Sequence, residues 1–371
     1  MKNQKKIKLD LIYNAFENYK VILKFLNSDK RIVSMVGLQY LPFLSLNLLD
    51  IIKKFDYEQD ANDRYPQNIM SFSKLMKENR LLIKQETDAN NYNIIKKNNL
   101  RFLDDNYKHL IKDYNRFQNL IIKTFGQKDY CVYSFMGIPF FNNIQQMRFI
   151  EIFETNSENK KSDLIQITSS MANFLQKFLS MHSNIEDFNP TYTESIYGSE
   201  MNFDMNDYYV YDEARSDLFK NNLRVDQNIF LFNLVCAVNS ANYLYPEVIG
   251  LSGTALLRYK YITYLILVKG LWLYNKKFNS LNKNLKSIVD KSNSIFKNEN
   301  NRRQFRNNLF HFDLADDADF EESLIHSLVN YHLDINIEYF DSVVTDSSNI
   351  YVFEANKMLF NEQKQFIGTN C

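Results

Sequence analysis

Residues 302–312 read Arg302-Arg303-Gln304-Phe305-Arg306-Asn307-Asn308-Leu309-Phe310-His311-Phe312. This stretch holds the only tight cluster of Arg, Asn and His in the chain. At about 100° per residue on a helix, Leu309 and Phe312 fall within about 40° of Phe305. The spacing predicts a helix that packs this apolar stripe against a core and carries its polar side chains on the other half.

Three polar residues of this stretch, Arg306, Asn307 and His311, have the chemistry of a phosphate-handling site. Arg306 and His311 are five positions apart, about 140° around a helix, and Asn307 lies between them. A guanidinium binds phosphate oxygens with paired hydrogen bonds. An imidazole with a pKa of about 6.5 gains and loses protons near neutral pH. The arrangement predicts that these three residues act together.

The segment Arg306-Asn307-Asn308-Leu309-Phe310-His311 resembles the R-N-x-x-x-H form of the HEPN motif. HEPN domains form an α-helical superfamily that includes many metal-independent ribonucleases of toxin–antitoxin, abortive-infection and CRISPR-linked systems. The resemblance covers roughly residues 215–371, and the motif has the late position usual in these domains. It implies a mainly α protein whose C-terminal part is a HEPN-like up-and-down helical bundle.

The same resemblance implies an endoribonuclease and assigns roles to particular residues. His311 would act as general base or acid, and Arg306 would stabilise the charge that builds on the phosphoryl oxygens. Asn307 would hold His311 or the phosphate, while Arg302 and Arg303 would bind the RNA backbone. The cut would leave a 2′,3′-cyclic phosphate and would need no metal and no cofactor.

HEPN ribonucleases usually build one active site from two copies, so the resemblance implies a homodimer or higher oligomer in which each chain supplies half a site. Single-stranded RNA is the expected substrate, because unstacked nucleotides can align the 2′-oxygen for attack. The family also implies a toxin in antiphage defence, with an antitoxin or a phage-derived trigger as a partner. The alternative is a non-catalytic HEPN-like module that binds RNA or a partner protein.

Charge is distributed unevenly along a chain whose net charge is zero. Residues 254–311 contain twelve Lys and Arg against two acids, Asp290 and Glu299, whereas residues 312–350 contain ten Asp and Glu and no Lys or Arg. The basic segment suits a polyanion. The acidic segment could instead fold back and neutralise it, and both interpretations stay open. Asp313, Asp316 and Asp317 fit a solvated turn better than a metal site.

Composition favours long helices, since only eight Gly and five Pro interrupt the chain. We expect a largely helical N-terminal domain over 1–200, with helical patterns at 7–27 and 92–125, that restrains the nuclease or senses a trigger. A HEPN-like catalytic domain would follow over 215–371. Residues 184–215 are rich in Asp, Asn, Ser and Tyr and predict a linker. Residues 127–141 are the best strand candidate of the first half.

In the second half, two apolar runs predict buried helices. One begins near 229 and is expected to end before Pro246, and the other runs from Ser252 to Trp272 or beyond. Arg258, Lys260 and Lys269 make the second a buried helix of a soluble protein and not a membrane span. We expect a polar linker over 279–301 and a further helix over 320–340. The basic N-terminus lacks the apolar core of a signal peptide, which predicts a cytoplasmic protein.

Overall fold

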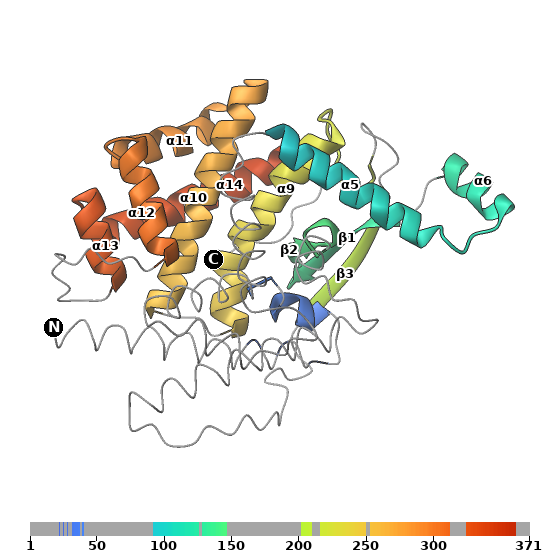
Figure 1. The fold of residues 1–371 in the computed structure, drawn as a ribbon, viewed down its shortest axis with the longest axis horizontal. Coiled ribbons are helices and arrows are strands. Elements are labelled where there is room, and N and C mark those ends of the chain that lie inside the picture. The colour runs from blue at the N-terminus through green and yellow to red at the C-terminus, as the bar shows by residue number, and fades with distance from the viewer. Residues whose placement is uncertain are drawn as a thin grey trace, which may run out of the picture.

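The computed structural model describes residues 92–125, 128–146, 202–209, 216–249, 253–311 and 324–360, and scattered positions between 22 and 40. Helices account for 75% of the described residues, and the strands described form one three-stranded sheet. The prediction of a mainly α protein is therefore confirmed. In Figure 1, α9 and α10 stand at the centre of the described part, with α11, α12 and α13 on one side and the sheet on the other.

Helices α9 (Val225–Asn239) and α10 (Gly253–Phe278) lie against each other and are buried over most of their circumference. Gly270 allows their close approach, because a Cβ atom at this position would lie only 2.8 Å from Leu234 Cδ1. The prediction that the second run extends beyond Trp272 is confirmed. Among the described helices, none has both the length and the apolar composition that crossing a membrane requires.

The sequence predicted that this helix ends before Pro246, but the chain does not leave the helix there. It continues from α9 into the π-helix η1 (Ser240–Ile249), which contains Pro246. A proline cannot donate the backbone hydrogen bond that continues an α-helix, and a π-helix changes the pairing of the neighbouring carbonyl groups. The Ser240 hydroxyl donates to Cys236 O at 2.8 Å at the start of this segment.

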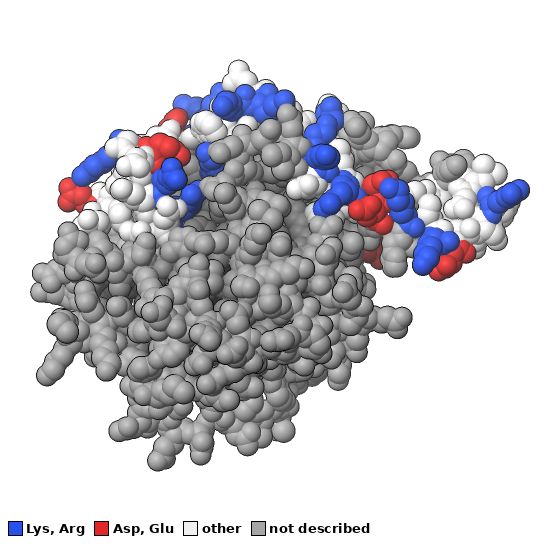
Figure 2. Space-filling model, viewed as in Figure 1, with Lys and Arg blue, Asp and Glu red and all other residues white. Residues whose placement is uncertain are grey.

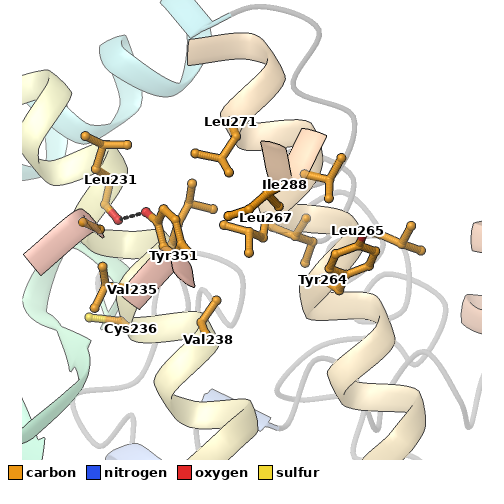
Figure 3. Close-up of a cluster of buried hydrophobic side chains, with 14 of the residues drawn as sticks. Leu231, Val235, Cys236, Val238, Tyr264, Leu265, Leu267, Leu271, Ile288 and Tyr351 are labelled. Carbon is orange, nitrogen blue, oxygen red and sulfur yellow. Dashed lines mark hydrogen bonds between the residues drawn. The ribbon is translucent and has the colours of Figure 1, made fainter. Parts of the chain in front are cut away.

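Four more helices pack around the central pair: α11 (Lys283–Ile295), α12 (Glu299–His311), α13 (Leu324–Leu333) and α14 (Ile337–Phe360). Helix α14 contacts α9, α10, α11 and α13. The buried hydroxyl of Tyr351 donates to Leu231 O at 2.7 Å, so α14 is joined to α9 inside an otherwise apolar core (Figure 3). A HEPN-like topology for these helices stays a prediction.

Helix α11 contradicts the expected linker over 279–301. The Asn282 side chain accepts a hydrogen bond from Leu285 N at 2.9 Å and so caps the start of the helix. Leu285, Ile288 and Ile295 are buried at helical spacing, so one apolar face packs on the core while the other residues stay in water. The prediction failed because polar Asn, Ser and Lys dominate the composition although the few apolar residues have the period of a helix.

The strand predicted over 127–141 is confirmed as a hairpin of β1 (Lys128–Phe135) and β2 (Ile138–Asn142). Met136 and Gly137 connect the strands with φ angles of 51° and 79°. Two consecutive positive φ angles match the right-handed twist of a tight hairpin, and glycine adopts such an angle without strain. Pro139 lies in β2, an edge strand of the sheet order β2-β1-β3, where a missing donor is tolerated.

The third strand, β3 (Phe203–Tyr209), forms within the segment predicted to be a linker. It pairs antiparallel with β1 from Lys128 to Phe135, and most of its side chains are exposed. The loop prediction is wrong here because backbone pairing with β1 compensates for the poor strand propensity of Asp and Asn.

The sheet and α5 (Tyr92–Leu110) share one apolar cluster with the second half of the chain. The centre of the Tyr92 ring lies 5.3 Å from that of Phe230 and 5.0 Å from that of Phe278. The ring centres of Tyr130 and Phe232 are 6.3 Å apart. Residues on both sides of the predicted domain boundary thus contribute to one core. The division into 1–200 and 215–371 stays a prediction.

The helical pattern predicted over 92–125 is present as two helices. Helix α6 (Arg116–Phe125) begins after a break at 111–115, where Asn115 Oδ1 accepts from Gln118 N at 2.8 Å and Gln118 Oε1 accepts from Asn115 N at 2.9 Å. This reciprocal pair is a capping box. Of the helix predicted over 7–27, all but Ile22 and Phe25 lie outside the described residues.

Candidate functional site

Helix α12 is anchored by the apolar stripe that the sequence predicted. Phe305 and Leu309 are both 0% exposed. The centre of the Phe305 ring lies 5.7 Å from that of Phe296, 5.6 Å from that of Phe340 and 6.0 Å from that of His332, so it packs against the end of α11, α14 and α13. Phe312 lies outside the described residues. The buried stripe fixes the rotation of α12 and therefore the direction of its polar residues.

A buried arginine of α10 holds the C-terminal end of α12. The Arg258 Nε atom donates to Leu309 O at 2.6 Å, and the residue is only 7% exposed. The last carbonyl groups of a helix have no hydrogen-bond partner inside the helix and carry partial negative charge. A cation there donates the missing hydrogen bond and balances this charge. His311 follows Leu309 by two residues and ends α12. Arg258 thus fixes the backbone that carries His311.

Arg306 and Asn307 are both half-buried on α12, although the sequence predicted that they face away from the core. The Arg306 Nη2 atom donates to Asn307 Oδ1 at 3.3 Å. The side chain of His311 lies outside the described part of the structure, although its backbone belongs to α12.

The two arginines predicted to bind RNA differ in their surroundings. The Arg302 guanidinium donates to Glu299 Oε2 at 3.0 Å and to Asn293 Oδ1 at 2.7 Å, and it lies 5.2 Å from the centre of the Phe296 ring. Arg302 therefore joins α12 to α11. Arg303 is exposed to solvent. Of the two, Arg303 is the one whose cation faces water.

The sequence did not reveal a second polar contact of α12, which involves His332 of α13. The Asn308 Nδ2 and His332 Nε2 atoms are 2.8 Å apart, and Asn301 Nδ2 donates to His332 O at 2.7 Å. His332 is 6% exposed, and burial lowers its pKa below the usual value, which favours the neutral ring that accepts a hydrogen bond. His332 is therefore a hydrogen-bonded residue of the protein interior.

Arg258 and His332 escaped the sequence analysis for the same reason. Their contacts with α12 join residues 51 and 24 positions apart, respectively. Arg258, one of three charged residues inside the apolar run of α10, was the one available signal, because buried arginines are rare unless paired. It served only to argue against a membrane span.

The basic segment is neutralised in part by the acidic segment. Lys291 lies 3.7 Å from Asp346 of α14, and Lys297 lies 3.9 Å from Asp334. Figure 2 nevertheless shows Lys and Arg side chains gathered along one edge of the molecule, over α11 and along α5. The acidic segment thus folds back on part of the basic one, and binding of a polyanion by the other lysines stays a prediction.

Possible metal ligands were sought in the same region. Within the part of the chain that the structure describes, no three His, Cys, Asp or Glu side chains are grouped as metal ligands would be. Asp313, Asp316 and Asp317 lie outside it.

Comparisons with models of protein families, with curated proteins and with solved structures find no match to this chain.

Proposed function

We propose that the protein is a metal-independent endoribonuclease of the HEPN type and that α12 carries its catalytic residues. The observation that supports this best is the hydrogen bond between Arg306 and Asn307, on a helix that ends at His311. The opposite side of the helix is locked by Phe305, Leu309 and the Arg258 contact. A rigid support is what a catalytic group needs, because small displacements of such groups lower rates strongly.

In the proposed reaction, the 2′-oxygen of a ribose attacks the adjacent phosphorus and the bond from phosphorus to the 5′-oxygen breaks. The attacking hydroxyl loses its proton, the leaving 5′-oxygen gains one, and a 2′,3′-cyclic phosphate remains. His311 acts as base or acid in these proton transfers. Arg306 stabilises the phosphoryl oxygens, a contribution of about 3–4 kcal/mol where one such donor has been removed. Asn307 positions His311 or the phosphate, and Arg303 binds the RNA backbone.

One chain supplies half of the proposed site, so the active form is a homodimer or higher oligomer in which two copies of α12 face each other. Single-stranded RNA is the proposed substrate. Uncontrolled cleavage would harm the cell that makes the enzyme. The N-terminal 200 residues are therefore proposed to restrain it until an antitoxin is lost or a phage-derived trigger appears, as in cytoplasmic abortive-infection effectors.

The test compares wild type with His311→Ala on a single-stranded RNA labelled at one end, with and without EDTA. We expect wild type to cut in both conditions and to leave 2′,3′-cyclic ends, and the variant to lose cutting. His326→Ala, in α13, is the matched control and should cut as wild type does. Equal turnover by wild type and His311→Ala would contradict the proposal, and loss of cutting with EDTA would contradict its metal-free chemistry.

The second candidate is a non-catalytic helical module that binds RNA or a partner protein. It is favoured by the number of polar residues of α12 that already bond within the protein, namely Asn301, Arg302, Arg306 and Asn308. In that case the labelled RNA would shift in a binding assay and stay intact with every variant. Cleavage lost with His311→Ala and kept with His326→Ala excludes this candidate.

A further inference from the structure

The second half of α10 carries an exposed aromatic ring between two lysines. Trp272 is 40% exposed. The Lys269 Nζ atom lies 4.5 Å from the centre of its ring, and the Lys276 Nζ atom lies 5.0 Å from it. Positions three before and four after Trp272 lie on the same side of a helix. We name this set of three residues the Trp272 platform.

The lysines of the platform have no acidic partner in the part of the chain that the structure describes. Among the described residues, no carboxylate lies within ion-pair distance of Lys269 or Lys276, in contrast to Lys291 and Lys297. Lys277 and Lys283 follow at the turn into α11 and are also exposed. These lysines lead from α10, which carries the platform, into α11, over which Figure 2 shows a basic edge. Such a surface attracts a polyanion.

The aromatic ring indicates which kind of polyanion the platform binds. A solvent-exposed tryptophan among lysines combines a surface for stacking with cations for phosphates, which is the combination that binds single-stranded nucleic acids. The ammonium groups lie near the ring because its π-electrons attract cations. A base that stacks on the ring can displace an ammonium group toward the adjacent phosphate. An acidic peptide would use the lysines and leave the ring without a function.

The platform also faces the same side of α10 as the contact with α12. Trp272 is fourteen residues after Arg258, which corresponds to about 40° around the helix and about 21 Å along it. Between them, Ile262 and Leu265 on this side are buried, and the side chains become exposed from Lys269 onward. The platform therefore begins where this side of α10 reaches the surface, and buried side chains separate it from the contact with α12.

We propose that the Trp272 platform is a binding site for single-stranded RNA, separate from the α12 motif, which holds the substrate away from the cleavage site. This inference rests on the proposed function only in naming RNA as the nucleic acid. It adds a binding site that the motif itself does not provide.

Trp272 is the only tryptophan in the chain, so its own fluorescence reports occupancy of the platform. The probes are an oligouridine and an oligodeoxyuridine of about 16 nucleotides, near the upper size of a typical single-strand site. The second lacks the 2′-hydroxyl and cannot be cut. We expect both probes to quench the emission at low salt, and added salt to reverse the quenching. Absence of quenching by both probes overturns the proposal.

Variants separate stacking from charge. In an anisotropy assay with a labelled oligouridine, Trp272→Leu should weaken binding about tenfold or more through loss of one stacked base. Lys269→Gln with Lys276→Gln should make the slope of log K against log salt shallower by about 1.4, as expected for two lost contacts to a single strand. The matched control, Lys291→Gln with Lys297→Gln, removes the same charge from paired lysines and should bind nearly as wild type does.

Three further outcomes overturn the proposal that the platform binds RNA, and none of them depends on cleavage. They are equal weakening by the two lysine pairs, unchanged binding by Trp272→Leu, and competition by polyglutamate at the concentration at which oligouridine competes, which would mark a site for acidic proteins. Thermal unfolding confirms that each variant is folded. If the protein binds both probes at Trp272 and cuts no RNA, the platform is supported and the proposed ribonuclease function is contradicted. If the protein cuts RNA and all variants bind equally, the ribonuclease function is supported and the platform is contradicted.

Discussion

The arginines of α12 and the lysines of the Trp272 platform belong to the same basic segment, but their surroundings differ. Arg302 and Arg306 donate hydrogen bonds to Asn293, Glu299 and Asn307. Lys269 and Lys276 lie beside one exposed ring, with no carboxylate of the described residues in ion-pair distance. A count of charges along the sequence treats both groups alike. The comparison indicates that α12 holds groups in fixed positions, while α10 offers charge that a ligand can use.

The largest effect should come from removing the anchor of α12. Phe305→Ala deletes a ring that is 0% exposed and packs on three other elements, and we expect a loss of about 3–5 kcal/mol in the free energy of unfolding. Trp272→Leu changes a side chain that is 40% exposed and should change stability by about 0.5 kcal/mol or less. Chemical denaturation of both variants measures the difference. Comparable losses would mean that Trp272 is part of the core and not of a binding surface.

A second prediction separates chemistry from binding. Arg306→Ala should lower RNA cleavage by about 10²–10³-fold, the cost of losing one donor to a developing oxyanion, while affinity for oligouridine stays within about twofold. Lys269→Gln with Lys276→Gln should do the opposite, raising KM and leaving kcat close to wild type, because the lost contacts are equal in the ground and transition states. Steady-state kinetics with anisotropy on the same RNA provides both values. A fall in kcat for the lysine pair would place the platform inside the active site.

The sequence predicted those features that repeat along one helix. Phe305 and Leu309 are buried as their spacing required, and α12 lies where the motif predicted a helix. Helix over 92–125 and strand over 127–141 were predicted for the same reason, since local period decides them, although the first is two helices and the second a hairpin. Asn307 was expected between Arg306 and His311 around the helix, because successive residues are about 100° apart.

Features that depend on a distant partner were not predictable in this way. Strand β3 exists because β1 offers its free edge, and α11 exists because Leu285 and Ile288 find a core that the sequence does not display. Arg258 reaches α12 across 51 residues. A local pattern contains no information about such pairs. The topology that relates α12 to the other helices depends on the same kind of contact.

The Arg258 contact yields a third, smaller prediction. Arg258→Met keeps much of the apolar length of the side chain and removes the donor to Leu309 O, and we expect a loss of about 1–3 kcal/mol in stability from the buried carbonyl left without its partner. Because this carbonyl is two residues from His311, cleavage should also fall while oligouridine affinity is kept. Lys260→Met, a half-buried neighbour, is the matched control. Unchanged cleavage by a folded Arg258→Met variant would show that the end of α12 needs no such support.

The smallest effect concerns pH and the buried imidazole of His332. Burial lowers its pKa in the folded protein below the value of about 6.5 that it has in the unfolded chain. Between these two values the unfolded chain binds the proton and the folded protein does not, so this contribution to stability is complete above about pH 6.5 and is lost as the pH falls through the folded value.

His332→Gln keeps a side chain that can accept a hydrogen bond from Asn308 but cannot titrate. The variant should therefore lose less stability than wild type between about pH 7 and pH 5. His326→Gln, on the same helix, removes a histidine from a less buried position and should follow the wild-type curve. Urea denaturation across this range measures the slopes. A steeper acid limb in His332→Gln would show that the folded protein prefers a protonated ring, and the Asn308 side chain would then have to accept from His332 through its oxygen.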